Sequence, residues 1–96
     1  LEIHKRVYGD EHPTVAISLD NIGTAWAELD DLHKALDYHK QALEIHKRVY
    51  GDEHPTVAIS LNNIGVAWTG IGKSRKALNY YEKALAIYKR IYGDEQ

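Results

Sequence analysis

Six histidines are the side chains of this sequence best suited to chemistry, because imidazole binds metals and transfers protons near neutral pH. Four of them are two copies of two positions in a repeated segment: His4 and His46, and His12 and His54. Repetition of that segment explains these histidines better than metal coordination does. The chain has no cysteine, which excludes a thiolate metal site. We therefore expect no metal and no cofactor.

Carboxylates and hydroxyls form no recognisable catalytic arrangement. Asp10–Glu11 and Asp30–Asp31 are neighbours in predicted turns, whereas acid–base catalysis needs groups placed separately around one reacting bond. No paired base is evident near either pair. Ser18, Ser60 and Ser74 have no nucleophile-elbow motif around them. We therefore expect that the protein is not an enzyme.

Charge and hydropathy exclude two classes of partner. The clusters His4–Arg6 and His46–Arg48 stand at predicted helix ends, where cations interact favourably with the helix dipole. A net charge of −2 and a pI near 6.3 argue against nucleic acid as the partner. No apolar run is long enough to span a membrane, and no signal peptide is visible. We expect a cytoplasmic protein, and the lack of cysteine is compatible with a reducing compartment.

The chain is organised as a repeat of 42 residues. The segment Leu1–Leu19 returns letter for letter as Leu43–Leu61, and a weaker copy runs from Leu85 to Glu95. All differences between the first two copies of the unit fall between Asp20 and Gln41 and their counterparts. We divide the chain into the end of a preceding unit (residues 1–12) and two units (13–54 and 55–96). We expect it to be a single fragment of a longer array.

Each unit is predicted to contain two helices, called A and B, because apolar residues recur at helical spacing. The A helices have one apolar stripe, Val15, Leu19, Ile22, Trp26 and Leu29 in the first unit. Proline begins each A helix, Ser74 is expected to cap the second B helix, and Gly23 marks a close approach of another helix. The predicted ranges are Leu1–Tyr8 (the end of a B helix, closed by Gly9), Pro13–Leu29, Leu32–Tyr50, Pro55–Ile71 and Ser74–Tyr92.

The B helices are apolar on two edges, so each is predicted to pack against its own A helix and against the next one. In the last helix we assign the edge for a following A helix to Tyr80, Ala84, Ile87 and Ile91. Trp26 and Trp68 are predicted core residues, whose truncation would cost about 3–5 kcal/mol each.

Two motifs resemble the tetratricopeptide pattern W-x₂-L-G-x₂-Y…A-x₃-F. They are LDNIGTAW with ALDYH in the first unit and LNNIGVAW with ALNYY in the second. Leucine stands where the pattern has its first Trp, Trp replaces Tyr, and His39 replaces Phe. The 42-residue period, with NNIG and YGDEHP, is similar to that of kinesin light chains and their bacterial relatives. The resemblance implies an all-α, tetratricopeptide-like solenoid of stacked antiparallel helix pairs that forms a right-handed superhelix.

The resemblance also implies a concave groove, lined by the A helices, that binds extended peptide segments of other proteins. Asn21 and Asn63 match an asparagine that hydrogen-bonds the peptide backbone in that family, and an amide both donates and accepts. The flanking positions would be Asp20, Asn62, Thr24, Val66, Ala27, Thr69 and Glu28. Neither A helix carries the Lys or Arg with which some members hold a terminal carboxylate. Asp20 and Glu28 favour a neutral or mildly basic peptide.

Other readings of these positions remain open. Asn21 and Asn63 are also explained as solvated positions or as partners of a neighbouring helix. The whole chain is also explained as a structural spacer or a self-assembling repeat with no separate ligand. Because both ends would expose apolar repeat surface, we expect a homo-oligomer, formed by end-to-end stacking or by a domain swap hinged at Gly51–Pro55 or Gly70–Gly72.

Overall fold

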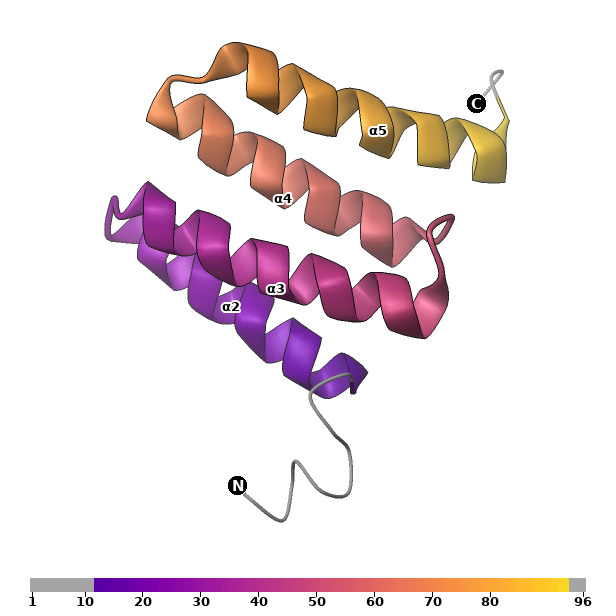
Figure 1. The fold of residues 1–96 in the computed structure, drawn as a ribbon, viewed down its shortest axis with the longest axis horizontal. Helices are drawn as coiled ribbons and strands as arrows, with labels where there is room; N and C mark the ends of the chain where they lie inside the picture. The colour runs from indigo at the N-terminus through magenta and orange to yellow at the C-terminus, as the bar shows by residue number, and fades with distance from the viewer. Residues whose placement is uncertain (1–11, 94–96) are drawn as a thin grey trace.

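The structure, a computed structural model, describes residues 12–93, and these form four α-helices with no strand among them (Figure 1). The helices are α2 (Pro13–Glu28), α3 (Leu32–Tyr50), α4 (Pro55–Ile71) and α5 (Ser74–Tyr92). The predicted ranges are confirmed, except that α2 ends one residue early and Leu29 is its C-cap. The expectations for Leu1–Tyr8, Gly9 and Asp10–Glu11 lie outside the described residues.

The two A helices, α2 and α4, begin with the same histidine cap. The backbone N–H of Thr14 donates to Nδ1 of His12 over 3.0 Å, and Thr56 does the same to His54 over 3.0 Å. Proline occupies the first turn of each, as predicted, where its missing N–H is no loss. The tyrosine Tyr50 stacks on the ring of His54, with centroids 4.2 Å apart. These contacts explain His12 and His54 as structural groups.

The B helices begin differently from each other. Asp31 caps α3 by accepting the backbone N–H of Lys34 over 3.3 Å. The prediction that Ser74 caps α5 is wrong, because Ser74 is already the first helical residue. Lys73 holds the cap position and offers no side-chain hydrogen bond, since an ammonium group cannot accept one. The first turn of α5 is therefore less well satisfied than that of α3.

Consecutive helices run in opposite directions, and each packs on the next: α2 on α3, α3 on α4 and α4 on α5 (Figure 1). The prediction that a B helix packs on two sides is therefore confirmed for α3. One buried cluster joins α2 to α3 and contains Ala16, Ala42 and Ile45. A larger cluster joins α3, α4 and α5, with Leu36, Leu43, Val57, Ala58, Leu61, Ile64, Ala67, Ala84 and Ile87.

The assignment of the two B-helix edges was wrong. Ala84 and Ile87 of α5 are buried in the cluster with α4, and their counterparts Ala42 and Ile45 pack on α2. The edge with these residues therefore meets the A helix of its own unit. The edge that meets the following A helix carries Leu36 and Leu43 of α3, which lie two helical turns apart. Small alanines allow close approach within a unit, whereas leucines fill the space between units.

The mid-helix glycines of the A helices mark close approach, as predicted for Gly23. A Cβ atom on Gly23 would lie 2.9 Å from Nε2 of His39, and one on Gly65 would lie 2.7 Å from Cε1 of Tyr81. Carbon atoms do not come this close without a shift. The glycines therefore let the ring of each B helix sit against the backbone of its A helix.

The two tryptophans are less buried than predicted. Trp68 packs against the large cluster, but both Trp26 and Trp68 remain only half-buried. One face of each ring contacts the ammonium group of a lysine. The Nζ of Lys34 lies 4.1 Å from the Trp26 ring centre, and that of Lys76 lies 4.5 Å from the Trp68 ring centre. Such cation–π contacts keep the ammonium groups at the surface.

Candidate functional site

Equivalent residues on the two A helices, most of them exposed, form a candidate binding surface. Asn21 and Thr24 lie at exposed positions of α2, whereas on α4 Val66 is exposed and Asn63 is half-buried. Residues four and seven apart share one side of a helix. We call this surface the A face and define it as Ile17, Asn21 and Thr24 on α2 with Ile59, Asn63 and Val66 on α4.

The isoleucines Ile17 and Ile59 were missed by the sequence analysis. Their side chains are 55% and 51% exposed, although large apolar residues in two identical positions are usually buried. Each precedes the asparagine of its helix by four residues and therefore lies beside it. The available signal was that both stand outside the buried A-helix stripe. They give the A face an apolar component.

Asp20 is held inside its own unit. Its Oδ1 accepts a hydrogen bond from Nδ1 of His39 over 2.8 Å, and its Oδ2 lies 3.4 Å from Nε2 of His46. Both histidines are buried on α3, so the carboxylate partners two groups that would otherwise lack one. The second unit has Asn62 in place of Asp20, with tyrosines in place of the histidines. The carboxylate and both of its histidine partners are therefore all replaced in the second unit.

The remaining flanking residues divide by their surroundings. The hydroxyl of Thr69 donates to the backbone oxygen of Gly65 over 3.0 Å and lies 3.3 Å from the Tyr81 hydroxyl of α5. It is thus engaged within its own unit. Glu28 is exposed at the end of α2, and Asn62 and Ala27 are half-buried.

The A face carries no charged side chain. Neither α2 nor α4 contains a lysine or arginine, and its amides and hydroxyl are uncharged. Within residues 12–93, no three histidine or acidic side chains are arranged to hold a metal ion. In the same part of the chain, no helix has the length and apolar character needed to cross a membrane. The chemistry of the A face is hydrogen bonding and apolar contact.

Repeated antiparallel helix pairs, each stacked on the last, define the helical-repeat class of proteins. A family model for the tetratricopeptide repeat matches residues 1–46 and 27–90. The chain therefore belongs to the tetratricopeptide repeat family, whose repeats generally mediate protein–protein interactions and are typically non-catalytic. The comparison with curated proteins gave no match.

Proposed function

We propose that the A face binds an extended peptide segment of another protein. The observation that carries this proposal is the repeated set of an isoleucine, an asparagine and a small or β-branched residue on α2 and again on α4. Asn21 and Asn63 hydrogen-bond the peptide backbone, because an amide offers both a donor and an acceptor. Ile17 and Ile59 contact its apolar side chains. Two equivalent sets suit a ligand that is itself a repeating chain.

The charge of the surface favours a neutral or mildly basic peptide. Glu28 extends the surface at the end of α2, and no cation on either A helix opposes it. A ligand rich in carboxylates would find no counter-charge on these two helices. A neutral peptide needs none, since amide hydrogen bonds and apolar contact supply the affinity.

Selection from a phage-displayed peptide library tests this proposal, followed by calorimetry on a selected synthetic peptide. Each of Asn21→Ala and Asn63→Ala should weaken binding about five-fold, the value of one hydrogen bond near 1 kcal/mol. The matched control is Gln41→Ala, an exposed amide on α3, which should leave affinity unchanged. Melting temperatures should move by less than about 3 °C, because these amides are not in the core.

Two results would contradict the peptide role. Early unfolding of both asparagine variants would make the amides structural. Selected peptides that bind the double variant as tightly as the natural chain would place the ligand on another surface.

A second candidate function, self-assembly into a longer stack, is favoured by the outer edge of α5. Leu78 and Leu85 are 55% and 53% exposed, whereas their counterparts on α3, Leu36 and Leu43, are buried against α4. The matching outer face of α2 exposes Ile22, whose counterpart Ile64 is fully buried against α3. The contact between α3 and α4 is thus a template for α5 of one copy on α2 of another. Such a head-to-tail contact repeats from copy to copy.

Light scattering at rising protein concentration tests this candidate. The mass should grow with concentration, and Leu85→Glu should hold the chain as a monomer. Val66→Glu is the control, because Val66 is as exposed as Leu85 but lies on the A face. A constant monomer mass up to millimolar concentration would exclude stacking and the alternative domain swap. A dimer that does not grow further would favour the swap.

A further inference from the structure

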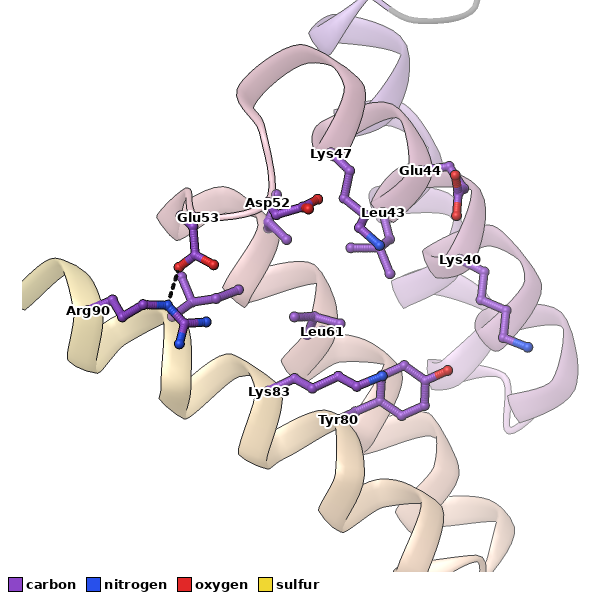
Figure 2. A pocket seen from close by; sticks show the side chains of 12 residues that line it. Lys40, Leu43, Glu44, Lys47, Asp52, Glu53, Leu61, Tyr80, Lys83 and Arg90 are labelled. Carbon is purple, nitrogen blue, oxygen red and sulfur yellow. Dashed lines mark hydrogen bonds and ion pairs between the residues drawn. The ribbon is translucent and has the colours of Figure 1, made fainter.

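A groove runs between the two B helices, α3 and α5, and none of the A-face residues lines it. It has a volume of about 520 Å³ and a floor of apolar side chains from three helices. Figure 2 shows lysines of α3 facing a lysine and an arginine of α5 across α4. We call it the B groove. Its floor is formed by Leu43, Val57, Leu61 and Ile87, with Tyr80 at one side.

The walls of the B groove carry more unpaired cations than anions. Arg90 pairs with Glu53 over 2.5 Å, and this hydrogen bond and charge raise the pKa of the guanidinium. Glu44 pairs with Arg48 over 3.6 Å. The ammonium groups of the three wall lysines have no carboxylate within ion-pair distance among residues 12–93. These lysines are Lys40 and Lys47 on α3 and Lys83 on α5.

Two aromatic rings form cation–π contacts with lysines in and beside the groove. The Nζ of Lys40 lies 5.8 Å from the ring centre of Trp68, and the Nζ of Lys76 lies 4.5 Å from the same centre. The Nζ of Lys83 lies 5.2 Å from the ring centre of Tyr80. All five residues line one hollow of about 300 Å³ that adjoins the groove. Like charges gathered in this way repel each other, and a bound anion would relieve the repulsion.

We propose that the B groove binds an acidic segment of a partner protein in extended conformation. Apolar side chains of the segment lie on the groove floor, and its carboxylates pair with the wall lysines. Lys40 and Lys47 are two helical turns apart, about 10 Å. An extended chain in the polyproline II conformation covers about 9 Å in three residues and returns its side chains to the same face. The groove therefore selects carboxylates about three residues apart with an apolar residue between them.

A peptide fits this groove better than a nucleic acid does. The apolar floor offers nothing to a phosphodiester backbone, which binds through charge alone. Asp52 and Glu53 line the same groove in the loop between α3 and α4, where they would repel phosphates, and Glu44 lies on α3 between Lys40 and Lys47 (Figure 2). An acidic peptide can place its carboxylates beside the wall lysines and its apolar side chains on the groove floor.

Fluorescence anisotropy tests the proposal with a labelled synthetic peptide that has glutamate at every third position and leucine between. The comparison peptide replaces every glutamate by glutamine. We expect binding of the acidic peptide only, weaker at higher salt because exposed charges are screened. The double variant Lys40→Gln/Lys83→Gln should weaken it by about ten-fold or more, as for loss of two charge-assisted contacts.

The control Lys34→Gln/Arg75→Gln removes the same net charge from exposed positions outside the groove. It should change the affinity by less than about two-fold, as expected for a remote charge. The A-face variants Asn21→Ala and Asn63→Ala should have no effect on the affinity for the acidic peptide. The proposal for the B groove and the proposed function of the A face are therefore tested independently. Amide chemical-shift changes should gather around Lys40, Lys83 and Tyr80.

Four results would overturn the proposal. They are equal losses in the groove and control variants, dependence on the asparagines, no binding at millimolar peptide, and tighter binding of a single-stranded oligonucleotide than of the peptide. Circular dichroism of each variant checks that the fold is retained.

Discussion

Ile22 and Ile64 occupy the same position of the repeat in two different environments, and their truncation tests how this fold is stabilised. Ile64 is fully buried between α3 and α4, whereas Ile22 is 42% exposed. Isoleucine to alanine removes about three carbon groups, worth about 0.8 kcal/mol each when fully buried. Ile64→Ala should therefore cost about 2.4 kcal/mol plus a cavity term, or about 3–4 kcal/mol in all.

Ile22→Ala should cost much less, about 1.5 kcal/mol, because its side chain loses less buried area and water fills the space left behind. Urea unfolding followed by circular dichroism measures both values. A difference of about 2 kcal/mol corresponds to a gap of about 1 M between the two midpoints. Ile59→Ala, with a half-exposed side chain on the A face, is the control for a truncation outside the packing between units.

Equal losses for Ile22→Ala and Ile64→Ala would refute this reasoning if they persist at low micromolar protein. The outer face of α2 would then be covered within a single molecule. Equal losses that appear only at high concentration would instead support stacking of copies on that face.

The other predictions concern contacts within single units, and urea unfolding checks each of them. Gly65→Ala should lower the free energy of unfolding by about 1–3 kcal/mol, because the new Cβ meets the ring of Tyr81; unchanged stability would show that the ring moves aside freely. Asp20→Ala should lower the free energy of unfolding by about 1–3 kcal/mol, because buried His39 loses its hydrogen-bond partner. An unchanged free energy of unfolding would show that this hydrogen bond does not stabilise the fold. His54→Ala should cost about 0.5–2 kcal/mol through loss of the helix cap, and a smaller loss would mean that water replaces the imidazole.

The helices and their stacking were predicted closely from the sequence, because the 42-residue repeat presents each sequence feature twice. Apolar spacing, the prolines and the helix-ending glycines agree in both units, and the observed ranges differ from the predicted ones by one residue. Gly23 was also interpreted correctly, since a glycine inside a helix needs a reason.

Three features could not be predicted from the pattern. Both edges of a B helix are apolar, so periodicity does not tell which one faces Ala16 and which one faces Ile64. The partners of Asp20 come from residues far along the chain, which spacing on one helix cannot reveal. The exposure of Ile17 and Ile59 follows from what lies beside α2 and α4, not from their residue type.

The position of α3 between the two A helices, α2 and α4, has a mechanical consequence. This helix packs on α2 with one edge and on α4 with the other, so the distance between Asn21 and Asn63 is set by how thickly α3 fills that space. A larger or smaller side chain at Leu36 or Leu43 would change the pitch of the stack by wedging the units apart or letting them tilt together. The spacing of the contact points for a ligand on the A face is thus set by leucines that do not belong to the A face.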